Sequence, residues 1–216
     1  MIADLKKCIT LYKHGNSAKI NLVACILFIV MSFLFVLVDG DGIVLGSMYS
    51  YLAVCLLTQV MVQNVLAGFV GASPLRKKIE LKYVDMMNVI IGVPLAILYL
   101  LFAVNIGSYE ESYAEIQIAC CGLMAIVMYP YLAVAYKYFW LGVIYVVVGL
   151  TFVLDTPVYF GEQLAPMLKG NMGLAVLIYA VLLFAGMGMG HLIRRILYRH
   201  DFSRFSLGAK FKSDLQ

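Results

Sequence analysis

Residues 71–104 read GASPLRKKIELKYVDMMNVIIGVPLAILYLLFAV and contain the pattern that decides the fold. Basic side chains crowd the first half of this stretch, and no charged residue occurs from Met86 to its end. About 20 apolar helical residues are needed to cross a hydrocarbon core roughly 30 Å thick. The stretch therefore predicts a basic segment outside the membrane, followed directly by a membrane-spanning helix.

The same alternation extends over the rest of the chain. Counting the window at 86–104, there are six long apolar windows, the others at 22–38, 43–70, 116–135, 138–154 and 172–190. With 63% hydrophobic and 13% charged residues and a mean hydropathy of +0.94, a soluble domain of 216 residues could not bury this surface. We predict an all-α polytopic membrane protein with one transmembrane domain over 1–216: an interfacial leader at 1–21, a six-helix bundle at 22–190 and a basic tail at 191–216.

Orientation follows from the positions of lysine and arginine. If six helices alternate in direction, fifteen of the sixteen basic residues fall on one side, and Lys169 alone falls on the other. Seven acidic residues lie in the segments on the side of Lys169: Asp39, Asp41, Glu110, Glu111, Glu115, Asp155 and Glu162. Basic residues accumulate in cytoplasmic segments, so both termini are predicted to be cytoplasmic. The basic residues then act as topology signals, which argues against nucleic-acid binding.

Two cytoplasmic segments have helical patterns. In the leader, Ile2, Leu5, Ile9 and Tyr12 recur at helical spacing, which favours a short helix in the membrane interface over a solvated basic tail. After the second window, Ser73 suits an N-cap and Pro74 the first helical position.

The residues after Pro74 can separate into two faces. In a short amphipathic helix parallel to the membrane, the apolar Leu75, Ile79 and Leu81 would face lipid or protein, and the basic side chains would face water: Arg76, Lys77, Lys78 and Lys82. A capped basic loop is the alternative. On the outer side, the apolar content of the loop at 155–171 predicts that it dips back or lies on the membrane surface.

Polar and small residues inside the windows leave alternatives open. Thr58, Gln59, Gln63 and Asn64 fall mostly on one face of the second helix, where they can line a translocation path or hold the bundle by hydrogen bonds. The spacing of Gly142 and Gly149 permits close approach of helices, within one subunit or between two. No window has a charged residue at its middle, which disfavours an ion-coupled carrier.

No pattern for catalysis or metal binding is present. The chain has neither a phosphate-binding loop nor a zinc-protease motif. Its five cysteines show no ligand spacing, and four of them lie inside windows. We therefore expect no enzyme activity, no bound metal, no cofactor and no disulfide in this chain.

The arrangement resembles the membrane subunit of an ABC-2 type exporter, in particular the small bacterial permeases. The resemblance covers nearly the whole chain in topology: six helices, an interfacial leader and a basic segment after the second helix. In sequence it is concentrated at Pro74, a basic residue at Arg76 or Lys77, and the pair Lys82-Tyr83 that opens the third helix.

This resemblance implies a function and a set of partners. The segment from Ser73 to Lys82 would be a coupling helix that docks on a separate ATPase, which binds ATP and magnesium, and the leader would be a second contact. Two permease copies, or this chain and a homologue, would pair along the first and fifth helices, which makes Gly142 and Gly149 candidate dimer contacts. The location would be a bacterial plasma membrane. The apolar lining favours an amphiphilic cargo such as a peptide, antibiotic or lipid.

Two other functions fit the same topology. The substrate-binding subunit of an energy-coupling-factor vitamin importer also has about six helices with both ends inside, although its docking pattern Ala-x-x-x-Ala is missing from the first helix here. A membrane scaffold protein without transport is the other. Neighbouring genes would discriminate, because an adjacent ATPase gene favours export.

Overall fold

The computed structural model describes residues 2–13, 17–38, 42–66, 75–106 and 114–199. Six helices in this part are long and apolar enough to cross a membrane. They cover Ala18–Leu37, Gly42–Val62, Leu75–Asn105, Ala114–Ala135, Phe139–Pro157 and Met172–Leu197. The predicted all-helical architecture with six apolar spans is thus confirmed, as expected of a multi-pass membrane protein.

The spans belong to a longer series of elements. The first two are α2 (Ala18–Val38) and α3 (Gly42–Leu66), and a short helix, α1 (Ile2–Lys13), precedes them. The last three are α8 (Ala114–Ala135), α9 (Phe139–Leu168) and α10 (Met172–Leu197). The third is composite and runs without a break through α5 (Leu75–Lys77), η1 (Lys78–Tyr83), α6 (Val84–Met87), η2 (Asn88–Gly92) and α7 (Val93–Ile106).

The start of the third span differs from the prediction. Residues 75–82 do not form a separate amphipathic helix, because they continue directly into the spanning helix. The predicted N-cap residues Ser73 and Pro74 lie outside the described residues. Two π-helical turns, η1 and η2, interrupt the α-helical geometry, and in η1 the amide of Val84 donates to the carbonyl of Ile79, five residues earlier. Such turns occur frequently at functional sites.

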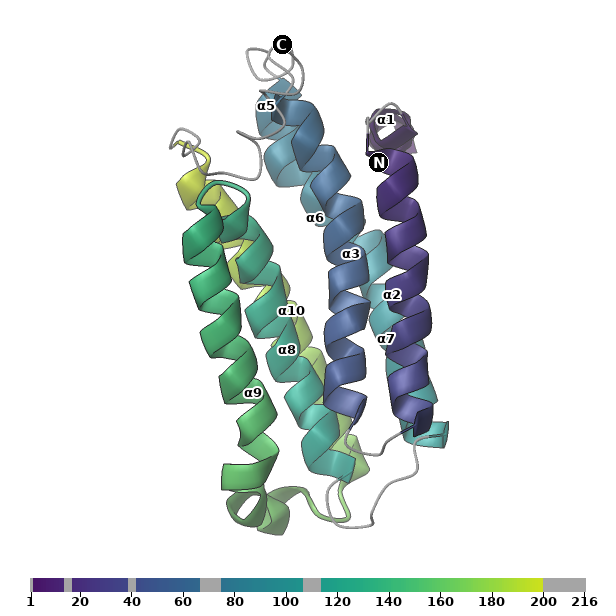
Figure 1. Ribbon diagram of the computed structural model, residues 1–216, viewed down its shortest axis with the longest axis vertical. Helices are drawn as coiled ribbons and strands as arrows, with labels where there is room; N and C mark the ends of the chain where they lie inside the picture. The colour runs from purple at the N-terminus through teal and green to yellow at the C-terminus, as the bar shows by residue number, and fades with distance from the viewer. Residues whose placement is uncertain (1, 14–16, 39–41, 67–74, 107–113, 200–216) are drawn as a thin grey trace.

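Figure 1 shows the spans standing side by side, with α8, α9 and α10 on one flank and α2, α3 and the composite third span on the other. The centre is formed by α3 and α8, of whose apolar windows 67% and 72% are buried, against 17% each for α2 and α9. One core cluster joins residues of α3, α7, α8 and α10. The exposed apolar faces of α2 and α9 are suited to contact lipid.

Helix α9 is longer than its membrane-crossing part. It continues through residues 155–168, which we had predicted to be an outer loop. Pro157 lies inside it and cannot donate a helical hydrogen bond, and in Figure 1 the last turns bend aside at the bottom of the bundle. The chain then turns at Gly170, whose φ of 78° suits glycine, before α10 begins.

Small residues bring α8 close to two of its neighbours, α9 and α10. A Cβ atom on Gly186 of α10 would lie 2.5 Å from the carbonyl oxygen of Ala125, and one on Gly142 of α9 would lie 2.7 Å from Cα of Ala135. A Cβ on Gly149 would lie 2.7 Å from a methyl group of Val127. The close approach permitted by Gly142 and Gly149 is therefore used within one chain, between α9 and α8.

Candidate functional site

Charged side chains gather at one end of the bundle, which we call the basic end and which contains α1, Leu75, Lys137 and Leu197. It is the upper end in Figure 1. All five ion pairs among the described residues include a residue near the start of the third span. One pair lies within the span, one joins it to α1, one joins it to Lys137, and two join it to α10. The third span is therefore the common partner of all of them.

The first network centres on Glu80, which is 2% exposed. Its carboxylate accepts a hydrogen bond of 2.8 Å from Nε of Arg76, one helical turn earlier, and lies 4.0 Å from the ammonium of Lys137. Lys137 follows α8, has no exposed surface and also donates to the carbonyl of Leu197 at the end of α10. Burial, and then the charge of Glu80, raises the pKa of Tyr136, so its phenol stays protonated. Glu80 thus joins the third span to the turn between α8 and α9 and, through Lys137, to the end of α10.

The second network centres on Asp85, in the α-helical turn between the two π-helical turns. Arg194 of α10 donates from its guanidinium to Oδ1, and Nδ1 of His191 lies 2.5 Å from Oδ2. Arg194 is 6% exposed, so a charge that would be costly alone is neutralised by Asp85. The two networks attach the third span to α10 at residues five positions apart in sequence.

The leader helix α1 is attached to the same segment. Nζ of Lys82 donates to Oδ2 of Asp4 over 2.6 Å, and this hydrogen bond lowers the pKa of the Asp4 carboxyl. Beside the pair, Cys8 is fully buried in a small apolar cluster with Ile79 and Tyr83. Burial raises the pKa of the Cys8 thiol to about 11. An apolar contact and an ion pair thus both attach α1 to the third span.

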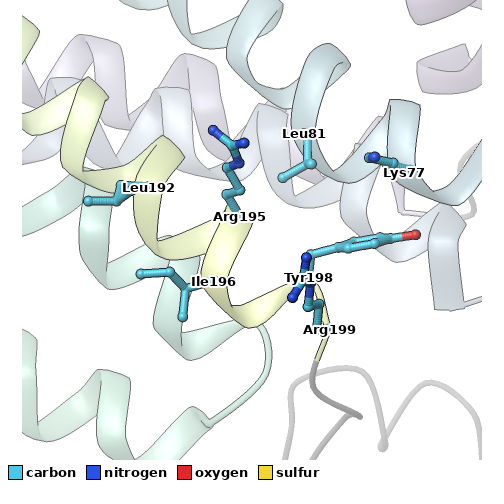
Figure 2. A pocket seen from close by; sticks show the side chains of 7 residues that line it. All are labelled: Lys77, Leu81, Leu192, Arg195, Ile196, Tyr198 and Arg199. Carbon is cyan, nitrogen blue, oxygen red and sulfur yellow. The ribbon is translucent and has the colours of Figure 1, made fainter.

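A groove lies on the outer side of these networks, between the third span and the end of α10. Its volume is about 590 Å³, and its lining consists of Lys77, Leu81, Leu192, Arg195, Ile196, Tyr198 and Arg199. Figure 2 shows Arg195 rising from α10 into the space beside Leu81, and the Tyr198 ring extending below Lys77. The guanidinium of Arg76 lies 5.4 Å from the centroid of that ring, so the Tyr198 wall is held by the Glu80 network.

The predicted coupling residues differ in what they offer to a partner. Leu75 is 45% exposed, and Lys77, Lys78 and Lys82 are exposed. Arg76 instead points inward to Glu80. The surface available to a partner is therefore formed by Leu75, Lys77 and Lys78, because Arg76 and Lys82 already have the carboxylates of Glu80 and Asp4 beside them.

Of the four predicted path residues on α3, the structure describes the side chains of two, Thr58 and Gln59. Thr58 is 2% exposed, and its hydroxyl donates to carbonyls of its own helix, at Val54 and Cys55. Gln59 is half-buried on α3. Gln63 and Asn64 lie within α3, but their side chains are outside the described residues. Thr58 thus satisfies its hydroxyl locally, while the other three remain path predictions.

The middle of the bundle contains a buried polar cluster of tyrosines that the sequence did not suggest. The hydroxyls of Tyr51 and Tyr179 lie 3.3 Å apart, and Tyr179 also donates to the carbonyl of Ala96. Near the opposite end, Tyr99 donates to the carbonyl of Ile43. These bonds connect α3, α7 and α10 across the core, where a buried hydroxyl needs a partner.

Sequence reasoning missed Glu80, Asp85 and Lys137 as site residues. Lys137 was interpreted as a topology signal and the two acids as part of a polar segment. One signal was available for Glu80, since Arg76 and Glu80 have the i, i+4 spacing of a helical ion pair. Neither Asp85 nor Lys137 has such a local signal, because their partners are 109 and 57 residues away in sequence.

Comparison with known proteins gives no relative: no family model, no curated protein and no solved structure matches the chain. Any function must therefore be argued from the residues and their arrangement.

Proposed function

We propose that the chain is the membrane-spanning permease subunit of an ATP-driven ABC exporter, coupled to a separate ATPase that binds ATP and magnesium. In this proposal the basic end faces the cytoplasm of a bacterium, in agreement with the distribution of lysine and arginine. The chain supplies the path across the membrane, and the partner supplies the energy.

One observation carries the proposal: ion pairs attach the start of the third span to α1, to the α8–α9 turn and to the end of α10. Glu80 connects it to Lys137 and Asp85 connects it to Arg194, while Lys82 connects it to α1. A displacement of this segment by a partner would therefore pull on α1, on the α8–α9 turn and on α10 together. Such a mechanical connection is what a permease needs if it performs no chemistry itself.

The docking surface in this proposal is the exposed part of the predicted coupling segment. Lys77 and Lys78 present positive charge beside the apolar Leu75, whereas Lys82 is paired with Asp4. An ATPase with an acidic groove would complement this surface, and α1 would provide a second contact. Arg76 would act inside the permease, by holding Glu80 and the Tyr198 ring.

Two copies would pair to enclose the path. Because Gly142 and Gly149 pack against α8, a pairing surface on α9 would use its exposed side, which includes Ile144, Val148 and Phe152. The exposed side of α2, for example Val23 and Leu27, would complete it. An amphiphilic cargo fits the apolar surroundings best, with Gln59 as a polar contact along the way.

The test is recovery of an ATP-hydrolysing partner with the tagged full chain from its native membrane in mild detergent. We expect the wild-type chain to retain the partner, and Lys78→Glu to reduce its recovery at least several-fold through charge repulsion. Lys169→Glu is the matched control, since it reverses an exposed lysine at the other end of the bundle. Arg76 is unsuitable for this test because its reversal would place two acids side by side at a buried site.

The outcomes separate the functions. Absence of an ATPase with the wild-type chain would overturn the exporter proposal. Tight binding of a vitamin by the isolated chain would then support the importer subunit, and absence of both an ATPase and vitamin binding would support a scaffold. Equal recovery with Lys78→Glu and Lys169→Glu would remove the third-span lysines from the docking surface while leaving the partnership intact.

A further inference from the structure

The groove between the third span and α10 has three cations without a counter-charge in the described part of the chain. Lys77, Arg195 and Arg199 are exposed, and none of the five ion pairs formed by described residues includes them. Neighbouring Arg194 is different, since it lies on the buried side of α10 and is neutralised by Asp85. The groove thus concentrates positive charge that no acidic side chain in the described ion pairs neutralises.

The apolar part of the groove continues along the membrane-facing side of α10. Leu177, Val181, Phe184 and Leu192 are each between 56% and 61% exposed and recur at three- or four-residue intervals once Gly188 is included. A Cβ on Gly188 would meet no atom within 4 Å, so there is open space above the helix backbone at this position of the stripe. The same helical face ends in Arg195 and Arg199. An apolar stripe therefore leads directly to a cluster of cations.

We infer that this surface is a binding site for an anionic phospholipid. The phosphate of the headgroup would lie between Lys77, Arg195 and Arg199 in the groove, and an acyl chain would follow the stripe past Gly188. The inference does not depend on the exporter proposal, because it requires only that the spans are in a bilayer.

The position of the groove favours a lipid over a soluble ligand. Arg195 lies at the end of the sixth membrane-crossing segment and Lys77 at the beginning of the third, which places both at the level of lipid headgroups. Basic pockets between spans at a membrane boundary are known sites for anionic headgroups. Leu192 and Ile196 are 56% and 58% exposed, and a soluble phosphate would leave both uncovered, whereas a lipid would cover them.

The experiment measures lipids retained by the purified full chain in mild detergent by native mass spectrometry. Phosphatidylglycerol and phosphatidylcholine with identical acyl chains are titrated separately. We expect about a 10-fold preference for phosphatidylglycerol, given the attraction of each basic residue for an anionic lipid. The triple variant Lys77→Gln, Arg195→Gln, Arg199→Gln should bind both lipids equally. The triple variant Lys6→Gln, Lys7→Gln, Lys13→Gln removes three exposed lysines from α1 and should keep the preference.

A second variant probes the acyl chain. Gly188→Leu adds a side chain to the stripe at an exposed helical position, and it should weaken phosphatidylglycerol binding without changing the helix content measured by circular dichroism.

Two results would overturn the inference. One is an equal loss of preference in the two triple variants, because binding would then reflect general surface charge. The other is displacement of the lipid by millimolar inorganic phosphate with no effect of Gly188→Leu, which would make the groove a site for soluble phosphate.

Discussion

Replacing Glu80 by glutamine tests whether buried charge holds the basic end together. The substitution keeps the size of the side chain and leaves an oxygen to accept from Arg76, but it removes the negative charge that lies 4.0 Å from the ammonium of Lys137. Lys137 is fully buried, so its ammonium would lose a compensating charge in a place without access to water. The expected effect is therefore larger than for any exposed pair.

The magnitude follows from the two contacts. Removing one partner of a buried ion pair costs about 3–5 kcal/mol. The value for Glu80 should lie near the lower limit, about 3 kcal/mol, because Arg76 is 24% exposed and Lys137 keeps its bond to the carbonyl of Leu197. Removing both charges with Glu80→Gln, Lys137→Met should recover about 2 kcal/mol of that loss, because no buried charge is then stranded.

The assay is unfolding of the full chain in mixed micelles with increasing dodecyl sulfate, followed by far-UV circular dichroism. Asp4→Asn is the matched control, since it removes a carboxylate from the exposed pair with Lys82 and should change stability little. The reasoning would be refuted if Glu80→Gln were no more destabilising than Asp4→Asn, or if the effects of Glu80→Gln and Lys137→Met were simply additive.

Further predictions concern packing and the leader. Gly186→Ala should lower the free energy of unfolding by about 2 kcal/mol in the same assay, because the new Cβ meets the backbone of Ala125 at 2.5 Å. Gly188→Ala should not lower it, because no atom lies within 4 Å of the new Cβ. Equal effects of the two substitutions would contradict the α8–α10 contact. Gly142→Ala should destabilise the single chain through its contact with Ala135, even where crosslinking shows no change in pairing. The leader is tested in a chain whose only cysteine is Cys8. The rise in the pKa of its thiol from 9.0 to about 11 should slow maleimide labelling about 100-fold near neutral pH, and Lys82→Gln should speed the labelling. Labelling at the rate of a free thiol would show that α1 is not docked.

The sequence predicted the spans well because their signal is local. A run without charge has to be long enough to cross a bilayer, and each of the six windows was found near its structural position. The outer loop predicted at 155–171 was wrong over most of its length, because residues 155–168 continue α9. Pro157 and Pro166 lie inside this helix, whose last turns bend aside in Figure 1.

The candidate site was predicted poorly because its signal is not local. Positive charge at Lys77 and Lys137 indicated a side of the membrane, but charge alone cannot say that one of them is exposed and the other buried against Glu80. The glycines show the same limit: their spacing indicated close packing, and only the structure identifies α8 of the same chain as what they pack against. Partners distant in sequence become visible only when the helices are assembled.

The π-helical turn at Lys78–Tyr83 makes the length of this segment unusually adjustable. It holds one residue more per hydrogen-bonded ring than an α-helix does, as the bond from Val84 to Ile79 shows. Deleting one residue from it would let the turn close as an ordinary α-helix. The residues on both sides would then stay on the helix faces that they occupy now. The same deletion in α7 would rotate everything beyond it by about 100°. The third span can therefore lose a residue at its charged beginning far more easily than in its apolar half, and related chains are expected to differ in length there.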